Sequence, residues 1–120
     1  MLTPEFAARF AAEWIVAWNA HDLDAILAHY ADDFIMSSPR IAVIAGEPSG
    51  TLRGKAAIGA YWRKALASTP TLHFELVTTL LGADSITLYY RGVRGLAAEV
   101  FFFDEHGHVG RAAAHYQTQR

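Results

Sequence analysis

The apolar residues of this chain follow two different periods, and the change between them falls near residue 70. Before it, they recur every three or four residues, which is typical of helices packed against a core. After it, apolar and polar residues alternate in four short runs separated by turn residues, which is typical of strands. Helices grouped before strands favour an α+β fold over repeated βαβ units. We therefore expect one layer of helices to cover one face of an antiparallel sheet.

Three helices are expected in the first part of the chain. Thr3, followed by a proline, is a suitable N-cap for the first, and Asp22 is placed to cap the second. Gly54 precedes the third, which should end at the Ser-Thr-Pro sequence of residues 68–70. Spacing of three and four residues gives each helix an apolar side, made of Phe6, Phe10, Trp14 and Trp18, of Leu23, Ile26, Leu27 and Tyr30, and of Ile58, Trp62 and Leu66.

The strands are expected in two groups. A short strand at residues 34–38 stops at Pro39, and residues 51–53 could pair with it briefly. Later runs at 72–81, 86–91, 96–104 and 109–118, separated by Gly-containing turns, predict an antiparallel meander.

The sequence also supports a prediction for each of two connecting segments. Asp32 and Asp33 are interpreted as capping or turn residues between the second helix and the first strand. Residues 40–50 have an apolar first half, so we expect this segment to be covered or to cover another part of the molecule.

Composition limits the classes of protein to which the chain can belong. Its 120 residues suit a single domain, 1–120. The chain is 52% hydrophobic and only 18% charged, which leaves more apolar residues than a core requires and indicates a pocket or an oligomer interface. A net charge of −2 provides no basic surface for nucleic acid or for an anionic membrane. The absence of cysteine excludes disulfides, thiolate chemistry and cysteine-based zinc sites.

The beginning of the sequence, MLTPE, lacks the basic residues and unbroken apolar run of a secretory signal. No stretch approaches the roughly 18 apolar residues that a membrane span requires. We therefore expect a cytoplasmic protein.

Three short strings lie at the boundaries of the predicted elements: WNAHDLDAI at residues 18–26, YADDF at 30–34 and GKAAI at 54–58. With this order of elements, the chain resembles the SnoaL-like branch of the nuclear transport factor 2-like superfamily over nearly its whole length. The resemblance implies a cystatin-like α+β barrel, in which three N-terminal helices close a curved antiparallel sheet around a cone-shaped pocket. It does not imply a reaction, because the superfamily includes isomerases, cyclases, dehydratases, epoxide hydrolases and non-catalytic binders.

Within the superfamily, the first helices resemble those of ketosteroid isomerases. The tyrosine that donates to the oxyanion in those enzymes corresponds to Trp14, the general-base aspartate to Ser38 and the second oxyanion-hole acid to Glu99. A serine cannot take up a proton near neutral pH, and an indole is a weaker donor than a phenol. The resemblance thus implies a retained pocket with a changed catalytic set, and it argues against steroid isomerisation by that mechanism. The catalytic sets of limonene epoxide hydrolases and scytalone dehydratases are not matched either.

Glu99 is the first candidate for catalysis. It lies in an apolar strand, where a carboxylate must be paired, protonated or directed into a cavity. The alternative is an exposed glutamate or one paired with Arg91, Arg94 or Arg111. If Glu99 points inward, the alternation of a strand also turns Phe101 inward.

His115 is the second catalytic candidate, because an imidazole titrates near neutral pH. It lies next to Tyr116 in the last strand, so only one of the two can face the pocket unless a bulge intervenes. The family comparison favours Tyr116, and an interface histidine is the alternative for His115. His106 and His108 flank a glycine and are interpreted as turn residues, so no metal site is predicted.

The remaining candidates would bind a ligand. Arg40 is expected at the mouth of the pocket, where it could attract an anionic ligand or be an ordinary surface arginine. Either Tyr89 or Tyr90 faces inward, and the pattern leaves this open. The predicted ligand-binding residues are Trp14, Trp18, Tyr30, Phe34, Met36, Ser38, Arg40, Trp62, Phe101 and Tyr116.

These observations favour a pocket protein for a small apolar or aromatic molecule. One hypothesis is a cofactor-independent isomerase, cyclase or dehydratase in which Glu99 or His115 moves a proton. The other is a non-catalytic ligand-binding or dimerisation module that has lost its base at Ser38. A homodimer is expected in either case, because one face of the sheet would lack a cover of helices.

Overall fold

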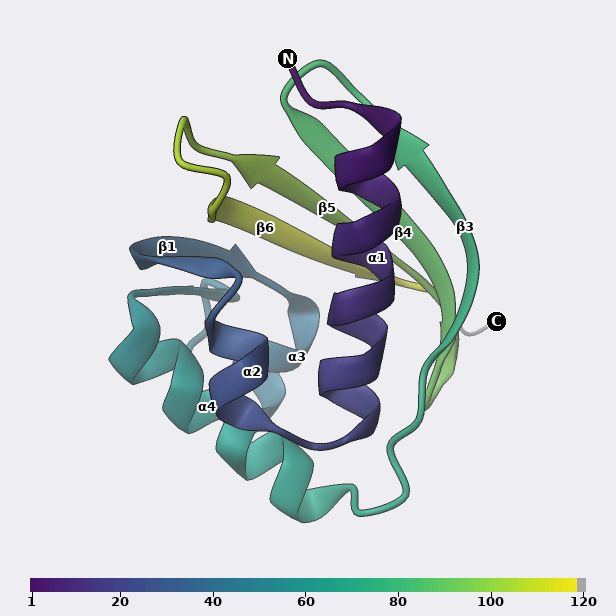
Figure 1. The fold of residues 1–120 in the computed structure, drawn as a ribbon. Helices are drawn as coiled ribbons and strands as arrows, with labels where there is room; N and C mark the ends of the chain where they lie inside the picture. The colour runs from purple at the N-terminus through teal and green to yellow at the C-terminus, as the bar shows by residue number, and fades with distance from the viewer. Residues whose placement is uncertain (119–120) are drawn as a thin grey trace.

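A curved six-stranded sheet wraps around helix α1 in the computed structural model, which describes residues 1–118 (Figure 1). The helices are α1 (Pro4–Asn19), α2 (Leu23–Leu27), α3 (Pro39–Ile44) and α4 (Lys55–Ser68). The strands are β1 (Tyr30–Ser37), β2 (Thr51–Arg53), β3 (Glu75–Leu81), β4 (Ser85–Gly92), β5 (Gly95–Phe103) and β6 (Val109–Tyr116). The predicted α+β class is confirmed, with all the helices before the last four strands.

The strands are arranged in the order β2-β1-β6-β5-β4-β3. The predicted meander from β3 to β6 is present, and β2 pairs with β1 through Met36 and Leu52. The expectation of a wholly antiparallel sheet is wrong, because β1 runs parallel to β6. These two strands are distant in sequence, so no hairpin fixes their relative direction.

Strand β1 begins at Tyr30, four residues earlier than predicted, and α2 ends at Leu27. Tyr30 satisfies the spacing of α2, but it pairs with Val109 in the sheet instead. The aspartates that follow therefore lie within β1, and the prediction that they cap or form a turn is wrong. Asp32 instead lies 3.5 Å from Lys55 at the start of α4.

The apolar segment after β1 contains α3, a helix that was not predicted. Ser38 caps it, since the backbone N–H of Arg40 donates to Ser38 Oγ at 3.1 Å. Ile41 is fully buried, as expected for a segment that covers another part of the molecule. Six residues are too few for helical periodicity to be evident in the sequence.

Both predicted N-caps of the first two helices are formed. Phe6 N–H donates to Thr3 Oγ1, and Ala25 N–H donates to Asp22 Oδ1, each at 3.1 Å. At the end of α1, Asn19 forms two hydrogen bonds with the backbone of Phe74, as donor at 2.9 Å and as acceptor at 2.7 Å. These bonds tie the turn between α1 and α2 to the segment that leads into β3.

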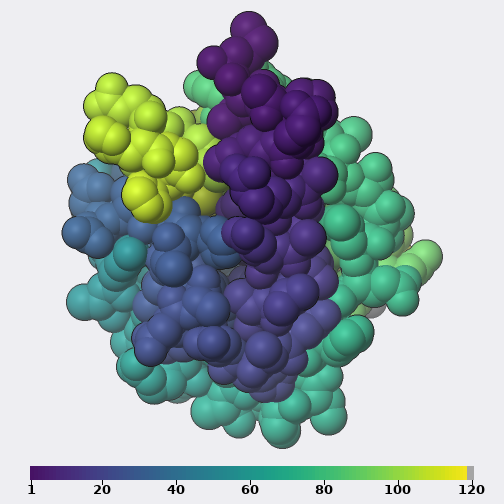
Figure 2. Space-filling view, in the orientation of Figure 1, coloured from purple at the N-terminus to yellow at the C-terminus, as the bar shows by residue number. Residues whose placement is uncertain are grey.

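The core lies between α1 and the concave face of the sheet. Trp14 is its central side chain, with its ring 5.3 Å from that of Tyr90 and 5.4 Å from that of Phe101. Figure 2 shows α1 across the middle of one face of the molecule, with α2 on one side and β3 on the other. Among residues 1–118, no helix combines the length and apolar character needed to cross a membrane.

Candidate functional site

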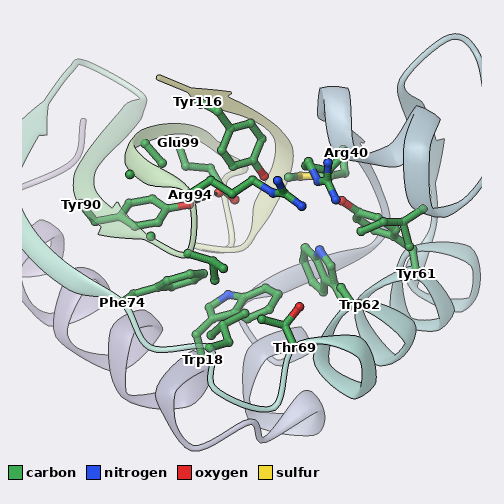
Figure 3. Close-up of a pocket in the computed structure, with 18 of the residues that line it drawn as sticks. Trp18, Arg40, Tyr61, Trp62, Thr69, Phe74, Tyr90, Arg94, Glu99 and Tyr116 are labelled. Carbon is green, nitrogen blue, oxygen red and sulfur yellow. Dashed lines mark hydrogen bonds between the residues drawn. The ribbon is translucent and has the colours of Figure 1, made fainter. Parts of the chain in front are cut away.

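A cavity of about 140 Å³ opens between the concave face of the sheet and the helices (Figure 3). It is lined from every layer of the fold, by α1, α3 and α4, by the segment before β3, and by β1, β4, β5 and β6. The lining residues are Trp14, Trp18, Met36, Arg40, Ile44, Tyr61, Trp62, Ala65, Thr69, Leu72, Phe74, Tyr90, Gly92, Val93, Arg94, Gly95, Ala97, Glu99 and Tyr116.

Aromatic rings form much of the wall. Phe74 stacks on Trp14 with centroids 5.6 Å apart and planes at 18°, and it also contacts Tyr90 at 4.8 Å. Trp18 and Trp62, from two different helices, meet edge to face at 5.3 Å. Such interlocked rings keep a cavity open and offer flat apolar surfaces to a ligand.

Glu99 is the one carboxylic acid among the lining residues, and only 4% of its surface is exposed. It stands on β5 opposite Leu88 on one side and Ala114 on the other, so its neighbours across the sheet are apolar. Tyr90 Oη donates to Glu99 Oε1 at 3.1 Å. Burial raises the pKa of Glu99 to about 7, against the opposing effect of this hydrogen bond. The group can therefore exchange a proton near neutral pH.

Three tyrosines line the same cavity as this carboxyl group. Burial is the main cause that raises the pKa of Tyr61, Tyr90 and Tyr116, so all three remain protonated at neutral pH. The hydroxyl groups of Tyr116 and Ser38 lie 3.4 Å apart. The cavity thus presents phenolic hydrogen-bond donors beside a titratable acid.

The two buried indoles of α1 differ in their hydrogen bonding. Trp14 Nε1 donates to Tyr30 Oη at 3.1 Å inside the core and is not free for a ligand. Trp18 Nε1 is buried and has no hydrogen-bond acceptor within residues 1–118. A buried N–H without an acceptor costs about 1–3 kcal/mol, so Trp18 Nε1 is an unsatisfied donor within the wall of the cavity.

Arginine supplies the positive charge of the site. Arg40, half-buried on α3, and Arg94, exposed in the turn between β4 and β5, both line the cavity. Figure 3 shows the Arg94 side chain extending across the cavity toward Arg40, with Tyr116 beside them.

The structure brings most, but not all, of the predicted site residues to the cavity. Of the twelve, seven line it: Trp14, Trp18, Met36, Arg40, Trp62, Glu99 and Tyr116. Tyr30, Phe34 and Phe101 point inward but are enclosed in the core, where the ring centroids of Tyr30 and Phe34 lie 4.4 Å apart. Ser38 lies behind Tyr116 and caps α3. These four belong to the support of the site rather than to its surface.

The prediction that His115 acts in the pocket is corrected. His115 pairs with Ala98 on the outer face of the sheet and is exposed there, whereas Tyr116, its neighbour, faces the cavity. The ladder between β5 and β6 is regular at this point, so strict alternation separates the two side chains. The choice left open between Tyr89 and Tyr90 is decided for Tyr90, which is buried and lines the cavity.

The turn between β5 and β6 holds the other two histidines considered. Asp104 Oδ1 accepts from the backbone N–H groups of His106 and His108, each at 2.9 Å, which is a turn arrangement. Within residues 1–118, no group of three or more metal-ligating side chains gathers at one place.

Sequence reasoning missed several lining residues, including Tyr61, Phe74 and Arg94. Tyr61 precedes Trp62 on α4, and both side chains reach the cavity from the side of that helix (Figure 3). Phe74 lies in the alternating run predicted as a strand at 72–81, but it was not assigned to the site. Arg94 lies in a turn, where no periodicity indicates direction.

Comparison with known proteins places this site in a recognised fold. A profile described as "SnoaL-like domain" matches residues 11–117. A crystal structure of a SnoaL-like protein of unknown function from Burkholderia thailandensis is 61% identical, covers 97% of this chain and 98% of its own, and superposes with a TM-score of 0.93. Among curated proteins, none matches this chain.

More distant structures share the fold alone. A protein of unknown function with a cystatin-like fold from Methylobium petroleophilum is 18% identical, with a TM-score of 0.77 and coverage of 99% of this chain and 80% of its own. An NTF2-like protein of unknown function from Burkholderia pseudomallei is 17% identical, with a TM-score of 0.71 and coverage of 93% and 91%. The chain therefore belongs to the SnoaL-like family and has the nuclear transport factor 2-like fold.

Proposed function

We propose that this protein binds a small, largely apolar or aromatic molecule in its cavity and moves a proton on that molecule with Glu99, without a cofactor. The observation that carries the proposal is the position of Glu99, a buried carboxyl group that lines an aromatic cavity and accepts a hydrogen bond from Tyr90. A carboxyl group held in such surroundings is suited to acid–base catalysis and is costly to keep for structure alone. The reaction would be an isomerisation, cyclisation or dehydration.

The chemistry follows from the groups around Glu99. In its ionised form, Glu99 takes a proton from a carbon atom next to a carbonyl group, and the electrons of the C–H bond move into an enolate. The Tyr116 hydroxyl, which lines the cavity, donates to the enolate oxygen and stabilises its charge. The neutral Glu99 then returns the proton to the same or another carbon atom. A pKa near 7 suits both steps, because each form of the acid is populated.

The test uses 2-tetralone, a small aromatic ketone with acidic hydrogens next to its carbonyl group. Exchange of these hydrogens in D₂O is followed by proton NMR with native protein and with the Glu99→Gln variant. We expect native protein to accelerate exchange, with a rate that rises through about pH 7, and Glu99→Gln to lose roughly 10²–10⁴-fold. Glu75→Gln, which removes an exposed glutamate from β3, should exchange at the native rate.

A second function is favoured by one observation. Ser38, which corresponds to the general base of the ketosteroid isomerases, has its hydroxyl engaged in capping α3. A family member without that base could serve as a ligand-binding module. Binding of 2-tetralone by native protein, with no exchange above that of Glu99→Gln, would favour this alternative over catalysis.

We also propose that two copies associate through the outer face of the sheet. Among residues 1–118, no helix covers this face. It carries the apolar and aromatic side chains of Leu80, Tyr89, Ala98, Val100, Phe102 and Ala113, together with Glu75, Arg91, Arg111 and His115. Leu80 is 58% exposed, which is a cost that a partner sheet would remove. A twofold dimer would bury the same residues on both copies.

A further inference from the structure

Arg40 and Arg94 give the cavity a positive charge that the protein does not balance. Both line it, and Glu99 is the one acid among the lining residues. Within residues 1–118, neither arginine forms an ion pair. By contrast Arg91, which is close to Arg94 in sequence but outside the cavity, lies 3.6 Å from Glu75. The uncompensated positive charge of these two guanidinium groups therefore belongs to the cavity.

Glu99 supplies only part of the missing negative charge, because both its neutral and its ionised forms are populated near neutral pH. Its Oε1 is engaged by Tyr90, and its position between apolar neighbours on β4 and β6 favours the neutral acid. Arg40 is half-buried and Arg94 is exposed, so solvent screens part of the repulsion between their like charges. An anion between the two arginines would remove this repulsion and could accept hydrogen bonds from both guanidinium groups.

The apolar part of a ligand has its own place. Trp18, Trp62 and Phe74 provide flat surfaces beside the arginines (Figure 3). These rings form an apolar surface that suits the ring of an aromatic ligand.

We propose that the ligand is a small aromatic carboxylate, held with its carboxylate between Arg40 and Arg94 and its ring among Trp18, Trp62 and Phe74. This proposal rests on the proposed function only in requiring that the cavity binds a small molecule. It adds the charge of that molecule and its orientation, with the anionic end at the mouth and the apolar end toward Glu99.

The test compares 2-naphthoate with 2-naphthamide, a neutral compound of nearly the same shape, by isothermal titration calorimetry. We expect native protein to bind the acid at least about tenfold more tightly, since hydrogen bonds to charged groups contribute more than neutral ones. Arg40→Gln and Arg94→Gln should each weaken binding of the acid about tenfold and leave the amide within about twofold. Arg63→Gln removes the same charge from an exposed site on α4 outside the cavity, and should change neither.

Circular dichroism spectra establish that each variant is folded, and Arg94, exposed in a turn, is the safer substitution. Equal affinity for acid and amide, or a preference for the acid that survives both arginine substitutions, would overturn the carboxylate proposal and leave the proposed function standing. Failure of both naphthalene compounds while 2-tetralone binds would also overturn it. If none of the three compounds binds, both the carboxylate and the proposed function fail.

Discussion

Tyr90 donates a hydrogen bond to Glu99 across the boundary between β4 and β5, with 3.1 Å between Tyr90 Oη and Glu99 Oε1. Both side chains are buried, and the bond is offered to a carboxyl group whose other neighbours across the sheet are apolar. The tyrosine therefore controls how easily Glu99 ionises. The cavity combines a group that can give or take a proton with a partner that adjusts its acidity.

Replacement of Tyr90 with phenylalanine should raise the pKa of Glu99 above 7. The hydroxyl group stabilises the carboxylate, and the loss of one such bond is worth roughly one pH unit. Carbon-13 NMR of the labelled Glu99 carboxyl group measures the change. Tyr89→Phe, on the outer face of the sheet, is the control. A pKa that stays at its native value or falls would show that Tyr90 does not stabilise the ionised form.

Glu99 should make the fold less stable as pH rises. Its pKa is near 4.5 in the unfolded chain and about 7 in the folded protein, so the folded state prefers the neutral acid. Its contribution is complete below about pH 4.5 and is lost as pH rises through about 7. The full loss is about 3 kcal/mol.

Urea denaturation of native protein and Glu99→Gln, at about pH 4.5 and pH 8, measures this effect. The stability of the variant relative to the native protein should improve by about 3 kcal/mol at the higher pH, because the amide never ionises. Glu75→Gln, at an exposed site, should show no comparable change. A pH-independent difference for Glu99→Gln would mean that burial does not shift this group.

Asn19 should be important for stability and for the shape of the cavity. Its side chain both donates to and accepts from the backbone of Phe74, whose ring stacks on Trp14. Asn19→Ala removes both hydrogen bonds and should cost about 2 kcal/mol in thermal or urea unfolding. Asn19→Asp keeps an acceptor for the Phe74 N–H and should cost less. An equal loss in the two variants would assign the effect to the donated bond alone.

Val100→Lys should convert a dimer to a monomer. Val100 lies in the middle of the outer sheet face, where a buried charge would oppose pairing of two copies. Light scattering coupled to gel filtration gives the mass of each species. Val16→Lys, at an exposed position on α1, should leave the mass unchanged. A native protein that already elutes as a monomer would refute the dimer.

The sequence was sufficient for those features of the fold that depend on local spacing. Thr3 and Asp22 were identified as caps because a helix needs a side-chain acceptor at that point and few residues provide one. Alternation on a single strand predicted that Glu99 and Phe101 share one face, but it left open whether that face is the inner one; the structure places both side chains inside. By contrast, α3 was missed because one and a half turns carry too little periodicity, and Tyr30 was placed in a helix because it fitted two patterns.

The set of side chains that line the cavity depends on contacts between residues that are distant in sequence. Seven of the predicted site residues line it, but Tyr30, Phe34 and Phe101 do not, since periodicity distinguishes inside from outside and cannot tell a filled core from an open one. The bond between Tyr90 and Glu99 depends on the register of two strands, and Arg40 and Arg94 line the same cavity only because a short helix and a turn are brought to it. The sequence by itself determined the class of fold and the helix caps, because these depend on local spacing. Only the tertiary structure decided that Glu99 points inward and which side chains share the cavity, because packing between distant residues sets those directions and distances.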